Sequence, residues 1–230
     1  MLEFLNSALG LLFPEFCAGC GEKGRTFCDT CKTKIDFVDP NYSCPLCGRF
    51  LGHGVVCGEC IESKRNYSNG FFIYYYTEPL RNAIHEFKFE KRKKVGRMMV
   101  RMAEKRISEL RGRFDYLLPV PITEKRLKER GFNQAYILAM EISRITKIPV
   151  LPNVLIKIRD TKDQYTLDKD ERKRNIKGAF AIKGKNSLVK KRTLIVDDLF
   201  TTGYTLMEAA RVVANQKPES VSVFALARAL

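Results

Sequence analysis

Two adjacent carboxylates, Asp197 and Asp198, follow a short apolar segment and precede a run of small, mostly hydroxyl-bearing residues at positions 201–205. Backbone N–H groups at the start of a helix attract anions, and Gly203 would let the backbone approach one closely. Carboxylates beside such a loop suit a ribose phosphate: they accept hydrogen bonds from its 2- and 3-hydroxyls while the loop holds the 5-phosphate. They also stabilise positive charge developing at C1. The alternative is a strand that ends in two Asp before a capped helix.

All eight cysteines lie in the first 60 residues, as four Cys-x-x-Cys pairs: Cys17/Cys20, Cys28/Cys31, Cys44/Cys47 and Cys57/Cys60. Two such pairs complete a tetrahedral shell around one metal ion, so the pattern predicts two Cys₄ zinc sites. A closed shell leaves no position for substrate, which indicates a structural role. Adjacent or interleaved pairs could share a zinc ion; we favour adjacent pairs, since each half is then a self-contained ribbon. His53 is expected to be a loop residue.

A disulfide scaffold is the main alternative for these cysteines. Residues 1–5 lack the basic segment and cleavage site of a secretion signal, so we expect a cytoplasmic, reducing compartment. Iron–sulfur ligation and a redox Cys-x-x-Cys are weaker alternatives. No apolar run approaches the ~20 residues of a membrane helix, so no membrane insertion is expected.

The formal net charge of +15 is unevenly distributed. Residues 1–60 hold five Lys or Arg against seven Asp or Glu, and the remaining residues hold 36 against 19. The basic surface therefore belongs to the C-terminal part. An anionic polymer is one explanation and a solvated lysine-rich surface is the other.

These residues need a scaffold, and the hydrophobic pattern predicts one. Polar residues 61–66 read as a linker between a cysteine domain, 1–63, and a second domain, 64–230. Strands are expected at 70–77, 115–119, 149–158, 193–196 and 220–227, and helices at 79–89, 95–110, 133–147 and 204–216. This alternation predicts a mostly parallel α/β sheet flanked by helices. The basic cluster at 125–130 is assigned no element. The long polar run 159–178 is typical of a functional lid or of disorder.

The segment at 193–205 resembles the phosphoribosyl-pyrophosphate (PRPP) motif of type I phosphoribosyltransferases. Together with the cysteine pairs, further motifs in order make the chain similar to the ComF family, amidophosphoribosyltransferase-like proteins linked to competence for DNA uptake. The resemblance covers nearly the whole chain. The motifs are LPVP at 118–121, RLKERGFNQ at 126–134, Thr161 through Gln164 to Leu167, ERKRN at 171–175, GAF at 178–180 and LAR at 226–228.

The resemblance implies roles for particular residues. The turn at Val120 would be the pyrophosphate loop, with Arg126 or Arg130 as clamps, and 161–175 would be a flexible loop closing over PRPP. Mg²⁺ would accompany PRPP, and Asp197 and Asp198 would be the catalytic pair. Phe200 stands where smaller residues also occur, and we expect no consequence. The implied PRPP contacts are Lys88, Val120, Arg126, Arg130, Arg172, Asp197, Asp198, Thr201, Thr202, Gly203, Tyr204 and Thr205.

Three functions remain open. The resemblance implies a part in natural transformation, handling single-stranded DNA in the cytoplasm, with DNA-uptake or helicase proteins as candidate partners. The alternative is an active phosphoribosyltransferase of nucleotide metabolism with an unknown acceptor, and a third is a regulator for which PRPP is a signal. Tyr74, Tyr75 and Tyr76 could stack on a single strand, although aromatics in a strand are more often core.

Overall fold

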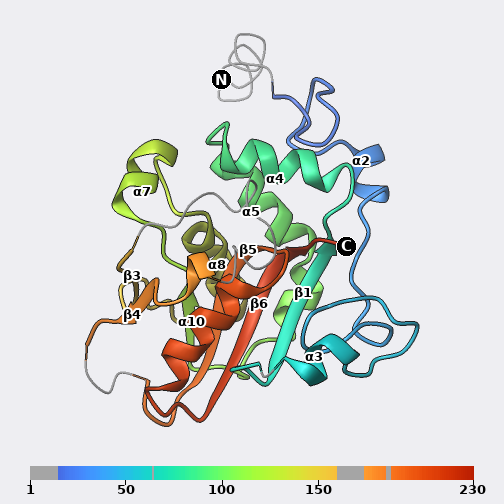
Figure 1. Ribbon diagram of the computed structural model, residues 1–230. Coiled ribbons are helices and arrows are strands. Elements are labelled where there is room, and N and C mark those ends of the chain that lie inside the picture. The colour runs from blue at the N-terminus through green and yellow to red at the C-terminus, as the bar shows by residue number, and fades with distance from the viewer. Residues whose placement is uncertain (1–14, 64, 160–173, 185–187) are drawn as a thin grey trace.

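The computed structural model describes residues 15–63, 65–159, 174–184 and 188–230. Its centre is a four-stranded sheet in the order β1-β6-β5-β2 (Figure 1). These strands are β1 (Asn69–Tyr75), β2 (Tyr116–Pro119), β5 (Arg192–Phe200) and β6 (Ser220–Arg228). Every pairing in this sheet is parallel, which confirms the predicted mostly parallel α/β architecture.

Helices cover both faces of the sheet. One core joins the sheet to α4 (Leu80–Lys88), α5 (Lys93–Met102), α6 (Glu104–Ser108) and α8 (Gln134–Thr146). The opposite core joins it to α10 (Tyr204–Ala214) and to a small antiparallel pair, β3 (Leu155–Lys157) and β4 (Phe180–Ile182). The basic helix α7 (Glu124–Arg130) buries none of its residues. The sheet is therefore enclosed on both sides, as parallel sheets usually are.

The cysteine segment, with α2 (Asp29–Thr33) and α3 (Gly58–Glu62), packs against both cores. Cys17 and Cys31 belong to the first core, whereas the second group of four cysteines belongs to the other. Between the two groups, the chain runs antiparallel to β1: Val38 N donates to Ile73 O at 2.9 Å and Tyr75 N donates to Asp36 O at 2.9 Å. This pairing covers the outer edge of β1, which would otherwise offer open hydrogen-bonding groups. A domain boundary after residue 63 stays a prediction.

Several predicted elements have different limits. β5 continues through both aspartates to Phe200 because it stays paired with β6, where Phe200 lies opposite Arg228. Residues 149–158 are not one strand: Val150 makes an isolated bridge to Leu117, and only Leu155–Lys157 forms a strand, in the second sheet. The helix predicted at 95–110 breaks at Ala103, and the basic cluster at 125–130 lies on α7.

The aromatic residues at the end of β1 serve the core. Tyr74 is fully buried and its hydroxyl donates to Met99 O at 2.8 Å. Tyr75 is half-buried, with its hydroxyl 3.1 Å from Ser43 Oγ. The hypothesis that Tyr74 stacks on single-stranded DNA is therefore wrong. In the parts of the chain that the structure describes, every helix is too short or too polar to cross a bilayer.

Candidate functional site

A cavity of about 150 Å³ opens where β2 and β5 end. Ligands of open α/β sheets bind at this carboxyl edge. The cavity brings together eight of the residues implied by the family resemblance: Lys88, Val120, Arg126, Arg130, Asp197, Asp198, Thr201 and Thr205. They come from three stretches of the chain, Lys88, positions 120–130 and positions 197–205, which only the fold brings together.

The remaining residues of the predicted set fall in three places. Gly203 and Tyr204 line a small recess that adjoins the cavity through Asp197 and Thr201. Thr202 is half-buried in the same loop but lines neither of these two hollows. Arg172 lies outside the described residues.

The two aspartates face opposite sides of the sheet. Side chains alternate along a strand; Val196 packs in the core under α4, and Ile195 in the core under α10. Asp198 therefore lies on the α4 side, where Lys88 Nζ approaches its Oδ1 at 3.0 Å. Both side chains of this ion pair are about nine-tenths buried, with 10% and 11% exposed. Lys88 thus neutralises Asp198 within the site.

Asp197 lies on the α10 side, beside the loop at 201–205. Its environment raises the pKa of Asp197 to about 7: desolvation contributes most, repulsion by Asp198 adds to it, and Lys88 opposes both. One of its oxygens accepts from the backbone N–H of Asp198 at 2.9 Å. This carboxyl therefore titrates near neutral pH, as groups in binding and catalytic sites often do.

The loop after β5 is shaped by Gly203. Its φ of 78° lies in the left-handed region, and an added Cβ would lie 2.3 Å from the Phe200 ring. No side-chain hydrogen bond caps α10 among the described residues, so the first N–H groups of this helix face the loop. The expectation that Phe200 has no consequence is wrong: it packs edge-on against Phe72, at 5.0 Å between ring centroids, and excludes any side chain at position 203.

The base of the predicted flexible loop is a hairpin. β3 and β4 pair antiparallel, and Arg159 Nη2 donates to Asn175 O at 2.8 Å and to Lys177 O at 2.7 Å. These bonds hold the two ends of the segment together beside the cavity, which Lys157 and Ile176 also line. Residues 160–173, most of the predicted loop, lie outside the described residues.

The cavity also contains residues to which the sequence assigned no role. Asn133, Gln134 and Ala135 open α8, and Asn133 Nδ2 donates to Val120 O at 3.0 Å. The first two belong to the RLKERGFNQ motif, which was a signal for them. Lys157 had no such signal, because only the hairpin brings it to the cavity.

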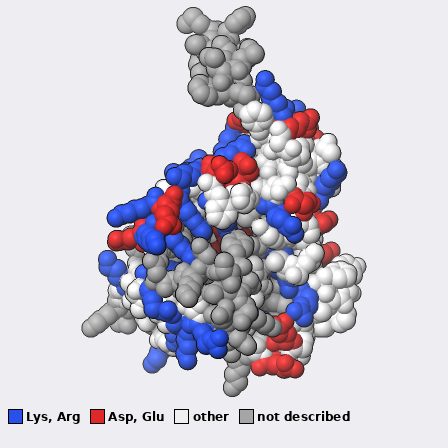
Figure 2. Space-filling view, turned by 45° about the horizontal axis from the view of Figure 1, so that its top comes forward, with Lys and Arg blue, Asp and Glu red and all other residues white. Residues whose placement is uncertain are grey.

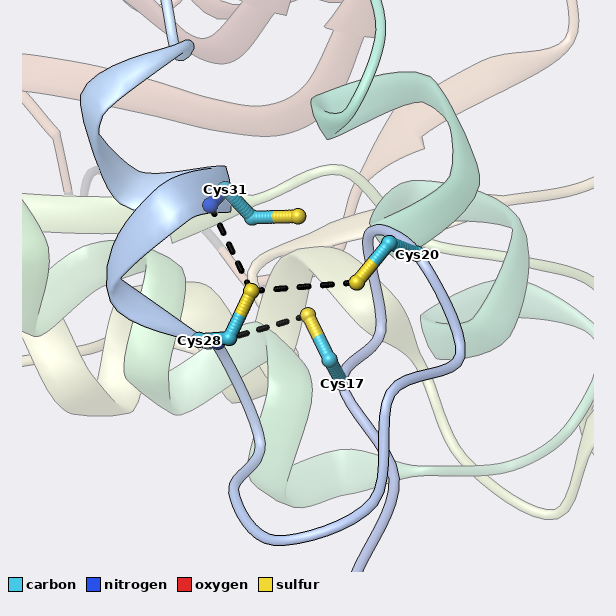
Figure 3. A group of neighbouring side chains, drawn as sticks. All are labelled: Cys17, Cys20, Cys28 and Cys31. Carbon is cyan, nitrogen blue, oxygen red and sulfur yellow. Dashed lines mark hydrogen bonds between the residues drawn. The ribbon is translucent and has the colours of Figure 1, made fainter.

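The cysteines form two groups of four, each made by adjacent pairs, as favoured from the sequence. Within each group the sulfur atoms all lie within 4.8 Å of one another, and Figure 3 shows those of the first group pointing to a common centre. Tetrahedral zinc with Zn–S bonds of about 2.3 Å requires sulfur separations of about 3.8 Å. Cys20 and Cys28 are 3.7 Å apart, as are Cys47 and Cys57. The donor set therefore fits zinc, and His53 belongs to neither group.

Hydrogen bonds favour one ionised sulfur in each group, whereas burial and the neighbouring sulfurs raise the pKa of Cys31 and of Cys60. Burial raises the pKa of the Cys17 thiol, but three backbone N–H donors outweigh it, and its pKa falls to about 6. The same balance lowers the pKa of Cys44 to about 7. Arg65 Nη2 lies 3.3 Å from Cys60 Sγ and supplies a positive charge to the second group. Thiolate is the form that binds zinc.

Comparison with known proteins supports both parts of this description. Residues 8–61 match the family model of a double zinc ribbon domain, and residues 127–230 match that of a phosphoribosyl transferase domain. The chain is thus a double zinc ribbon joined to a type I phosphoribosyltransferase fold.

Full-length relatives define the family more narrowly. Competence protein F of Haemophilus influenzae is 30% identical over 93% of this chain and 90% of that protein. DNA utilization protein YhgH of Escherichia coli K12 is 30% identical, over 81% of this chain and 84% of its own length. Competence protein ComFC of Bacillus subtilis is 28% identical, over 87% and 83%. The chain belongs to the competence protein F (ComF) family.

Among solved structures, purine phosphoribosyltransferase from Pyrococcus horikoshii shares 21% identity over 57% of this chain and 73% of that one, with a TM-score of 0.36. The Bacillus subtilis glutamine PRPP amidotransferase shares 16% over 61% and 30%, with a TM-score of 0.40. The fold class rests on the family model and on the sheet rather than on these scores.

Proposed function

We propose that this protein binds PRPP with Mg²⁺ at the cavity beyond β5 and acts in DNA uptake by handling single-stranded DNA in the cytoplasm. The PRPP part is supported by the groups that line one cavity and its adjoining recess. They are the two carboxylates, the start of α10 with Gly203, and several Lys and Arg side chains. The DNA part is supported by the names of the relatives, competence and DNA utilization proteins.

The ligand would lie across the cavity in a definite order. The 5-phosphate would occupy the loop at 201–205, where the N–H groups of α10 begin. The ribose hydroxyls would bond to Asp197 and Asp198, and the pyrophosphate would extend toward Val120, Arg126 and Arg130. Mg²⁺ would be held mostly by pyrophosphate and ribose oxygens and by water.

Each cysteine group would hold one structural zinc ion. Both groups are packed in the cores of the sheet, and seven of the eight cysteines are at least half-buried. Zinc would therefore contribute to folding rather than to chemistry.

The DNA contact would use the basic surface. Figure 2 shows Lys and Arg side chains crowding one flank of the visible face, with fewer Asp and Glu among them. Lys91, Lys93 and Lys94 are exposed around the start of α5, although Lys94 forms an ion pair with Glu15. Phosphates of a single strand would bind such a surface in a salt-dependent way.

The alternative, an active transferase, is favoured by one observation: the raised pKa of Asp197, about 7, would suit proton transfer at neutral pH. One experiment distinguishes a transferase from a DNA-uptake protein that only binds PRPP. PRPP is titrated calorimetrically with Mg²⁺, and pyrophosphate release is then measured with nucleobases, amines and single-stranded DNA as acceptors. Release with one acceptor would establish an enzyme, whereas binding without release favours PRPP as a ligand of a DNA-uptake protein.

A double variant tests the assignment of the ribose to the two aspartates. Asp197→Ala combined with Asp198→Ala is expected to abolish PRPP binding and leave the fold intact. Asp115→Ala is the matched control, because Asp115 precedes β2 at the opposite edge of the sheet, where it pairs with Arg192 at 3.1 Å. If the double variant keeps its affinity for PRPP, the ribose does not lie where we place it.

A further inference from the structure

The cavity contains a buried amide that the described protein leaves half satisfied. Gln134 lines the cavity and is only 2% exposed. Its Oε1 accepts from Arg130 Nη1 at 3.4 Å. Arg can only donate, so this contact fixes the orientation of the amide and leaves Nε2 as a donor. Among the described residues, Nε2 has no hydrogen-bond partner. Buried donors are rarely left unpaired, because removal from water is costly.

The position of Gln134 in the chain indicates which kind of ligand this donor would bind. It is the first residue of α8, a helix of 13 residues. Asn133 caps this helix by accepting from Tyr136 N at 3.3 Å, and the next residue, Ala135, also lines the cavity. The positive end of the helix dipole and the free Nε2 donor therefore face the same space. An anion would satisfy both at once.

We propose that the side-chain amide of Gln134, at the start of α8, is a further binding contact of the pyrophosphate position named above, distinct from the 5-phosphate loop of α10. This deepens the proposed function and rests on it, since pyrophosphate is the part of PRPP that remains once the ribose 5-phosphate is placed. Gln134 Nε2 donates to a pyrophosphate oxygen, and Arg130 approaches both the amide and the same anion.

The surroundings match this ligand in charge and in position. Lys88, Arg126, Arg130 and Lys157 line the cavity against two carboxylates, of which Asp198 is neutralised by Lys88. Asn133 Nδ2 donates to Val120 O at 3.0 Å and thereby fixes the turn after β2 against the start of α8. A ligand at that turn consequently lies beside Gln134 as well.

The test uses the full-length protein and two separate probes, inorganic pyrophosphate and ribose 5-phosphate, each titrated with Mg²⁺ present. Gln134→Glu replaces the donor by an anionic acceptor, and a carboxylate in the first turn of a helix favours folding. We expect it to weaken pyrophosphate binding at least tenfold while ribose 5-phosphate affinity changes less than twofold. Gln134→Met, which keeps the length and loses the donor, is expected to weaken pyrophosphate binding severalfold.

Gln216→Glu, just beyond the far end of α10, makes the same change of charge away from the cavity and should leave both affinities unchanged. The thermal unfolding temperature of each variant checks that it folds. If both Gln134 variants bind pyrophosphate as tightly as the wild type, the amide makes no such contact and the inference is overturned, even where ribose 5-phosphate still binds. If the wild type binds pyrophosphate through Gln134 but binds neither ribose 5-phosphate nor PRPP, the inference holds and the proposed function fails.

Discussion

Replacing Asp197 by Asn is expected to make the protein more stable at pH 8, although it removes a proposed ligand-binding group. The pKa of Asp197 is raised from its ordinary value of 3.8 to about 7, chiefly by desolvation. Below pH 3.8 the carboxyl is protonated in both folded and unfolded chains. As the pH rises toward 7, the unfolded chain has lost this proton while the folded chain still holds it, so folding stability falls through that window.

The size of this loss follows from the shift. One pKa unit corresponds to about 1.4 kcal/mol, so roughly three units give about 4 kcal/mol. Asp197 is partly exposed, and solvent screening reduces the figure, so we expect about 2 kcal/mol. Asn cannot ionise and keeps the oxygen that accepts from Asp198 N at 2.9 Å. The variant should therefore gain stability relative to the wild type between pH 5 and pH 8.

The assay is urea denaturation of both proteins at pH 5, 6, 7 and 8 with zinc held constant, so that effects on the cysteines cancel in the difference. Asp115→Asn is the contrasting control: hydrogen bonds from Arg192 lower the pKa of Asp115, so this variant should lose stability by a constant amount across the same range. If the Asp197→Asn and wild-type stabilities change in parallel from pH 5 to 8, the carboxyl ionises normally and our account of its burial is wrong.

Three further predictions concern other parts of the molecule. Elemental analysis should find two zinc ions per chain, and fewer than one would contradict the zinc assignment. Gly203→Ala should destabilise the fold by at least about 1–2 kcal/mol in urea denaturation, because it forces Ala into the left-handed region and against Phe200; unchanged stability would refute this packing. Replacing Lys91, Lys93 and Lys94 by Gln should flatten the slope of log K against log salt concentration for single-stranded DNA binding by up to about 2. An unchanged slope would exclude this surface.

The sequence could indicate the local part of the candidate site, because its signals are adjacent in the chain. The order of apolar strand, Asp197 and Asp198, small residues and helix is visible without a fold, and so are the four cysteine pairs. Lys88 could be suggested only as an anion contact; its buried ion pair with Asp198 depends on the end of α4 reaching β5. Tertiary contacts of this kind leave no trace in local spacing.

One error and one omission have the same physical origin. Phe200 was given no consequence because the sequence does not show that β5 continues past the aspartates and packs this ring on Phe72 and Gly203. Gln134 looked like one polar residue in a motif, since its burial and its unpaired Nε2 exist only after α8 docks at the cavity. Strand length and the burial of single polar groups are decided by neighbouring strands and helices rather than by propensity.

The packing of the second cysteine group explains why a structural zinc ribbon would accompany this site. Cys47 O accepts from Arg228 Nε at 3.0 Å, and Arg228 pairs with Phe200 across β6 and β5. Phe72, in the same core as that cysteine group, packs edge-on against the Phe200 ring. Phe200 in turn fixes the space at Gly203, where the proposed phosphate loop turns into α10. Because these contacts are continuous, the ribbon is part of the framework that shapes the loop, and a zinc ion held there would support the proposed ligand site without approaching it.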